Sequence, residues 1–178
     1  MEKIQNVQRT HKHKISEENV KQYVFERFND VKVSSKIKNL VNFQAMNKYM
    51  IMVHSQEELK RLGSIVANHK KKTASEIFDE YEKHLKNALE HKPTIKKHTN
   101  VIMHIFGYFS KHFIQNEKIM FFKLVDDFKK EKTTVGNILA EINPIIFRLN
   151  NIYLASQTYF LLYSDTQPEF FFTDKKYK

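Results

Sequence analysis

Hydrophobic residues recur every three or four positions along most of the chain, which is the spacing of amphipathic helices. This pattern predicts helices over residues 16–28, 34–53, 55–66, 73–90, 94–113, 116–130, 137–149 and 151–163. Ser55 and Thr73 each precede a glutamate by three positions, the capping-box pattern of a helix start. Only three Gly and three Pro interrupt the chain. We therefore expect an all-α, single-domain helical bundle of about seven to eight helices.

Several segments depart from the simple amphipathic pattern. Residues 34–53 are apolar nearly all round, which predicts a helix buried at the centre of the bundle. Residues 137–149 contain Pro144, which we expect to kink or split that helix. Residues 1–14 are polar and basic and predict a flexible N-terminal segment before a helical domain over 15–178. The run Phe170–Phe172 is expected to dock on the bundle or on a partner.

The stretch from Pro93 to Phe113 predicts one helix with two chemically different faces. One face carries an apolar stripe made of Ile95, Ile102, Ile105, Phe106, Phe109 and Phe113. The other carries a polar strip made of Lys97, Asn100, His104, Gly107, Tyr108 and Lys111. The strip is our main candidate ligand-binding site, because such groups bind phosphate or stack against a base, and glycine permits close approach. The alternative is a solvated face with Tyr108 packed on the next helix.

Two residues of the central helix are further ligand-binding candidates. Lys48 falls among apolar residues, and a buried lysine needs a partner or loses its charge. It therefore either lines a pocket with His54 or sits at the bundle rim with its ammonium in solvent. A Ser–His pair of His54 and Ser55 is disfavoured because Ser55 is needed as a helix cap. His98 falls on the apolar stripe and is expected to be a hydrogen-bonded core residue.

The composition narrows the chemistry. The chain has no cysteine, which excludes disulfides, thiolate metal sites and cysteine nucleophiles within it. Its histidines lack the spacing of a zinc set, so we expect neither a metal site nor a cofactor. The net charge of +10 favours anionic partners such as nucleic acid or nucleotide, although a lysine-rich compositional bias accounts for it equally well. Lacking long apolar runs and a signal-peptide core, the sequence predicts a cytoplasmic protein without a membrane partner, of unspecified oligomeric state.

Three motifs carry a family resemblance. They are Lys48-Tyr-Met-Ile-Met-Val-His54-Ser55 with Leu62-Gly63 after it, Lys97-His98-Thr-Asn100 with His104 and Gly107-Tyr108-Phe109, and Tyr153-Leu154 with Gln157 and Tyr159. In this order and spacing they resemble the YbgA family, a bacterial domain of unknown function, over roughly Phe43 to Pro168. Asn47 stands where the family usually has histidine. Of the family's Pro-Leu…Pro pattern before the last helices, only Pro144 remains. The sequence therefore does not determine the path of the backbone around residues 137–144.

The resemblance implies a modest set of functions. Family members occur alone or joined to a Cys-rich domain similar to iron–sulfur enzymes that remove sulfur from thiolated uracil. A chain without cysteine cannot hold such a cluster, so a Cys-rich desulfidase-like protein is implied only as a partner.

We expect a non-catalytic binding or accessory module for an anionic ligand. Nucleic acid or a nucleotide is the ligand that we favour. The first alternative is an enzyme, or enzyme subunit, acting on a modified (thiolated) nucleobase with Lys48, His104 and Tyr108 in a pocket. The second is a protein-interaction module that uses the Phe-rich tail. A closed pocket favours the enzyme, and an open basic face favours nucleic acid.

Overall fold

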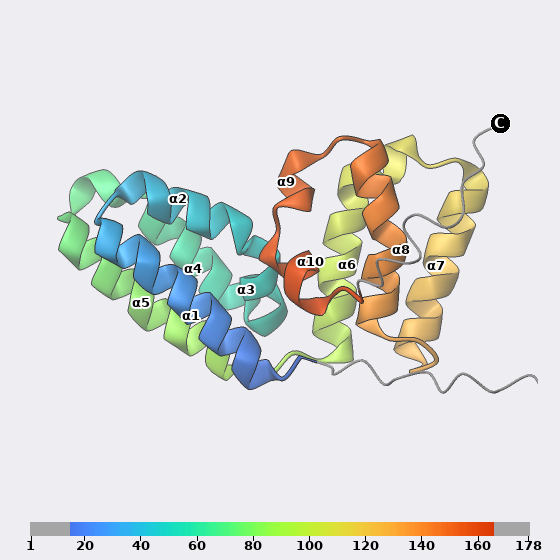
Figure 1. Ribbon diagram of the computed structural model, residues 1–178, viewed down its shortest axis with the longest axis horizontal. Coiled ribbons are helices and arrows are strands. Elements are labelled where there is room, and N and C mark those ends of the chain that lie inside the picture. Colours follow the sequence, from blue (N-terminus) through green and yellow to red (C-terminus); the bar gives the residue numbers. More distant parts are fainter. Residues whose placement is uncertain (1–14, 166–178) are drawn as a thin grey trace, which may run out of the picture.

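The computed structural model describes residues 15–165 and is helical throughout (Figure 1). Its α-helices are α1 (Glu17–Ser34), α2 (Ile37–Met46), α3 (Lys48–His54), α4 (Gln56–Ala67), α5 (Ala74–Glu90), α6 (Ile95–Phe109), α7 (Gln115–Lys129), α8 (Val135–Arg148), α9 (Ile152–Ala155) and α10 (Thr158–Tyr163). Two short 3-10 turns, η1 (His69–Lys71) and η2 (Ser110–His112), join them. No strand occurs in this part of the chain, which confirms the predicted all-α fold.

The helices form two groups that meet at α3. Figure 1 shows α1, α2, α4 and α5 packed together in one half, and α6, α7, α8, α9 and α10 in the other. Every residue of α3 from Tyr49 to His54 is buried, and the helix contacts α4, α5, α6 and α10. One continuous hydrophobic core runs through both halves, as expected of a single domain. The predicted flexible segment 1–14 and the run Phe170–Phe172 lie outside the described residues.

The predicted helix over residues 34–53 is in fact two helices. Ser35 ends α1 in the left-handed region, with a φ of 51°, and α2 then starts without a side-chain cap. Asn47 separates α2 from α3: its φ and ψ of −103° and 8° leave the helical region, while its side-chain Nδ2 donates to the Phe43 carbonyl at 2.9 Å. Only α3 is buried on all sides, so the centre of the fold is shorter than predicted.

Two other predictions near the C-terminal end need correction. We expected Pro144 to kink or split its helix; α8 runs through Pro144 without a break, so the split does not occur. Proline lacks an N–H, but Pro144 lies on the exposed side of α8, and the buried Ile142 and Ile146 hold the helix against the core on either side of it. The single helix predicted over 151–163 is instead α9 and α10, because the chain becomes extended at Gln157.

Helix α6 keeps its predicted faces but not its predicted length. Thr94 caps it, and Ile102, Ile105, Phe106 and Phe109 are buried. The α-helix ends at Phe109 rather than Phe113, and η2 follows. The tighter turn places the Phe113 ring 4.9 Å from that of Phe109, within an aromatic cluster that includes Phe121. Among the described helices, none combines the length and the apolar character needed to span a bilayer.

Candidate functional site

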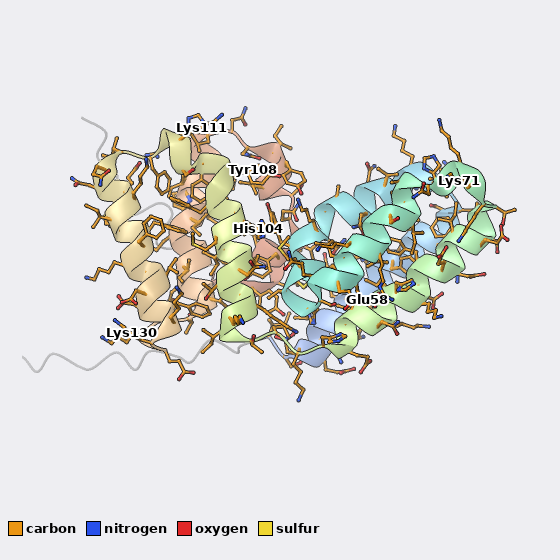
Figure 2. All side chains as sticks on the ribbon, turned by 180° about the vertical axis from the view of Figure 1, so that it is seen from behind. Glu58, Lys71, His104, Tyr108, Lys111 and Lys130 are labelled. Atoms are coloured by element: carbon orange, nitrogen blue, oxygen red, sulfur yellow. The ribbon has the colours of Figure 1, made fainter. Side chains whose placement is uncertain are left out.

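The three motif segments meet where α3, α6 and α9 come together. Tyr108, in the last turn of α6, stacks on Tyr153 of α9 with ring centroids 5.7 Å apart and an interplanar angle of 30°. Lys48 and Tyr49 begin α3, and His104 lies one turn before Tyr108 on α6. We call Lys48, Tyr49, His104, Tyr108 and Tyr153 the junction site. Figure 2 shows Lys111, Tyr108 and His104 following one another along α6 and its 3-10 extension.

The outer surface of α6 at this site is open. The Tyr108 side chain is 42% exposed, and His104 and Gly107 are exposed as well. A Cβ atom added to Gly107 would meet nothing within 4 Å, so no contact inside the protein requires glycine there. The three polar-strip residues nearest the junction therefore face solvent, and an aromatic ring is available beside them.

Tyr49 forms the buried inner edge of the junction site. Its ring is 1% exposed, and its hydroxyl has no hydrogen-bond partner of good geometry among the described residues. Burial, together with the nearby Tyr108 and Tyr153 hydroxyls, raises the pKa of Tyr49 well above its usual range. Burial likewise raises the pKa of Tyr153 to about 12. Both phenols consequently stay protonated at neutral pH and are available as donors.

Positive charge and fixed backbone complete the inner edge. The Lys48 ammonium lies 5.7 Å from the centre of the Tyr49 ring, and the lysine is half-buried. The Gln157 amide Nε2 donates to the Ala45 carbonyl at 2.8 Å, and its Oε1 accepts the Tyr49 N–H at 3.5 Å. Because Gln157 is buried between α9 and α10, these bonds explain the break between the two helices and fix α9 against α3.

The segments that build the junction carry no acidic residue. All 20 Asp and Glu of the chain lie outside residues 31–56, 91–116 and 149–164, which contain α3, α6 and α9. Lys48, Lys96 and Lys111 belong to these segments. An anion approaching the junction therefore meets no carboxylate from the elements that form it.

Two predicted site residues serve the fold instead of the open face. The Lys97 ammonium donates to the carbonyls of His54, at 2.6 Å, and Lys92, at 3.0 Å. It thus neutralises the negative C-terminal end of α3. The His54 ring is fully buried, with Nδ1 2.7 Å from the His91 carbonyl, and burial lowers its pKa to about 4. Lys97 and His54 therefore pin the end of α3 to the α5–α6 connection.

The remaining residues predicted from the sequence lie outside the junction site. Lys111 lies in η2, beyond the end of the α-helix that was expected to carry it. Asn100 is half-buried, two turns before Gly107 on α6. His98 is a core residue as predicted: its Nδ1 lies 2.7 Å from the Tyr159 hydroxyl. Among the described residues, no group of three or more His, Asp and Glu side chains is arranged to hold a metal ion.

Tyr49, Tyr153 and Gln157 are the site residues that sequence reasoning missed. Helical periodicity assigns Tyr49 to the core and gives no reason to connect it with Tyr108, which lies in another helix. The signal that could have found them is the family resemblance, because all three stand within the motifs quoted for it.

Comparison with known proteins agrees with the motifs. Residues 48–164 match the family described as "Protein of unknown function (DUF1722)", and this range contains every junction-site residue. The chain is also 27% identical to "Uncharacterized protein YbgA" of Escherichia coli (strain K12) over 125 residues, which cover 70% of this chain and 74% of that relative. No solved structure matches the chain. The protein whose motifs converge on the junction site belongs to the DUF1722 family, as the YbgA-like motifs predicted.

Proposed function

We propose that this protein binds single-stranded nucleic acid or a nucleotide at the junction site, without carrying out a reaction on it. The observation that carries the proposal is the stacked pair of Tyr108 and Tyr153, with Tyr108 42% exposed on an open face. Every nucleobase has a flat face that stacks on such a ring, and stacking contributes about 1–3 kcal/mol per base.

The charge around the stacked pair supports an anionic ligand. Proteins that bind single strands combine aromatic rings with positive charge that follows the phosphates. Lys48 lies on the inner side of the pair and Lys111 beyond the end of α6, while α3, α6 and α9 carry no carboxylate. The ring surface and the lysines are thus positioned to contact base and phosphate separately.

The openness of the site favours binding over catalysis. An enzyme acting on a nucleobase needs a site that excludes water around the reacting atoms. His104 and Tyr108 are exposed and Lys48 is half-buried, so these residues line an open face. Two surface hollows, each of about 360 Å³, lie on α5 and between α4 and α5, away from the junction site.

A protein-interaction function is a second candidate, supported by a different surface. Helix α7 exposes Ile119, Met120 and Phe122, with 57%, 64% and 47% of each side chain accessible. Exposed apolar side chains clustered on one helix are typical of protein contacts. The partner that the family resemblance implies is a Cys-rich desulfidase-like protein. A binding titration of such a purified protein with the Met120→Glu and Tyr108→Ala variants tests this function. If α7 forms the interface, Met120→Glu loses binding and Tyr108→Ala keeps it.

Fluorescence anisotropy with labelled, short single-stranded RNA tests the main proposal. Tyr108→Ala should weaken binding about tenfold, because one stacking ring is lost. Tyr23→Ala is the matched control, since Tyr23 is a half-buried tyrosine of α1 that lies beside Arg27 instead. Equal affinities for wild type and Tyr108→Ala, or no binding by the wild type, would show the proposal to be wrong.

A further inference from the structure

The Tyr49 hydroxyl is a buried polar group that the fold leaves unsatisfied. Within residues 15–165 its oxygen is inaccessible to solvent, and the neighbouring Tyr108 hydroxyl does not meet it with good hydrogen-bond geometry. Burying a hydroxyl without a well-oriented partner costs free energy, and most buried polar groups in proteins are paired. The hydroxyl lies at the inner edge of the junction site, beside those of Tyr108 and Tyr153. Its position indicates that a bound ligand supplies the missing partner.

The surroundings of this hydroxyl are rich in hydrogen-bond donors. The Tyr108 and Tyr153 phenols and the Lys48 ammonium are all hydrogen-bond donors. The nearby acceptor, Oε1 of Gln157, already accepts the Tyr49 N–H, and the Gln157 amide N–H group donates to Ala45. A ligand atom that enters this edge should therefore be an acceptor, such as a carbonyl oxygen.

Access to the hydroxyl depends on Tyr108. An exposed aromatic side chain changes rotamer on the picosecond to nanosecond scale. Gly107 beside it has no side chain, and the space around its Cα is open. A base that stacks on Tyr108 can thus turn one edge inward, toward Tyr49.

We propose that the junction site selects nucleobases that turn inward a carbonyl oxygen at C4 of a pyrimidine or C6 of a purine, namely uracil and guanine, and that the Tyr49 hydroxyl donates to that oxygen. The inference rests on the proposed function and adds a base preference to it. Cytosine and adenine present an amino group at the corresponding position, where uracil and guanine present an oxygen. An amino group there cannot accept the proton of the Tyr49 hydroxyl, which disfavours both bases.

Oligo(U) and oligo(C) provide the matched test, because their backbones and ring sizes are the same and the inward edge differs. The wild type should bind oligo(U) about three to ten times more tightly, the effect of one net hydrogen bond. Tyr49→Phe should reduce this ratio to nearly one. It should leave folding stability unchanged or raised, since it removes only an unpaired hydroxyl.

Tyr159→Phe is the control variant for this experiment. Tyr159 is also a buried tyrosine, but its hydroxyl is bonded to His98 away from the site, so its loss should leave the U-to-C ratio unchanged. Equal wild-type affinity for both oligonucleotides, or an unchanged ratio in Tyr49→Phe, contradicts the inference. The proposed function stands in that case if Tyr108→Ala weakens both complexes. Absence of binding to either oligonucleotide rejects both proposals, and a loss of stability in Tyr49→Phe assigns the hydroxyl a structural role instead.

Discussion

His98 and Tyr159 share a hydrogen bond in the core: the His98 Nδ1 atom lies 2.7 Å from the Tyr159 hydroxyl oxygen, and the contact joins α6 to α10. Tyr159 is fully buried and His98 nearly so. Tyr49 is equally buried, yet its hydroxyl has no such partner in the described part of the chain. The two tyrosines therefore form a natural comparison of a paired and an unpaired buried hydroxyl.

Removing each hydroxyl should change the free energy of unfolding in a different way. Tyr159→Phe should destabilise the protein by about 1–3 kcal/mol, because it takes a buried hydrogen-bond partner from His98. Tyr49→Phe should be neutral or slightly stabilising. Urea denaturation followed by circular dichroism measures both. A similar loss in the two variants would mean that the Tyr49 hydroxyl is satisfied in solution.

The two faces of α6 should respond oppositely to substitution. Phe109→Ala should destabilise the protein by about 3–5 kcal/mol, because it removes a fully buried ring and leaves a cavity. Gly107→Ala should stabilise it by up to about 1 kcal/mol, since alanine is the better helix former and its Cβ meets open space. Thermal melts of the two variants check these signs. A destabilised Gly107→Ala would place that residue in a packed contact.

The helices whose ends are set locally could be predicted from the sequence. Thr73 and Glu76 form the predicted capping box of α5, and Tyr81 and Leu85, one turn apart, are buried as amphipathic spacing requires. The breaks at Asn47 and Gln157 could not be predicted. Gln157 leaves the helical conformation where its side chain binds the backbone of Ala45, a residue more than a hundred positions away in the chain. Tertiary bonds of this kind override local propensity.

The candidate site shows the same division. The exposure of His104, Gly107 and Tyr108 follows from the periodicity of a single helix, so the sequence could indicate that face. The stacking of Tyr108 on Tyr153 depends on how α9 packs, which no local pattern contains. Lys97 looked available for a ligand because lysines usually face solvent, whereas the fold uses it to bind the His54 carbonyl.

Folding stability should fall as the pH is lowered from neutral. Burial lowers the pKa of His54 from 6.5 to about 4, although the hydrogen bond to the His91 carbonyl opposes the shift. The charges of Lys97 and Lys21 lower the pKa further, and Glu17 faces the ring at 3.9 Å. The unfolded chain therefore binds a proton near pH 6.5 that the folded chain does not accept until about pH 4. The stability that depends on a neutral His54 is complete above pH 6.5 and decreases as the pH falls to 4. The loss is at most about 3–4 kcal/mol.

Chemical denaturation at several pH values between 7 and 4 measures this loss. His54→Gln should show a smaller decrease in stability over the same range, because the variant has no imidazole to protonate. His112→Gln serves as the control, since His112 is exposed in η2 and its replacement should leave the decrease unchanged. Equal pH dependence in wild type and His54→Gln would mean that other groups cause the loss.

The salt dependence of RNA binding should identify Lys48 as a phosphate contact. Each phosphate contact to a single strand contributes about −0.7 to the slope of log K against log salt concentration, through release of a counterion. Lys48→Gln should therefore make the slope less steep by about 0.7. Lys60→Gln is the matched control, because Lys60 is an exposed lysine of α4 and its replacement should leave the slope unchanged. If Lys48→Gln weakens binding equally at every salt concentration, its ammonium contacts a neutral part of the ligand, and the phosphate contact assigned to it is wrong. If both variants reduce the slope by the same amount, the protein attracts RNA through its overall positive charge. In that case the junction segments, which lack Asp and Glu, do not position the strand.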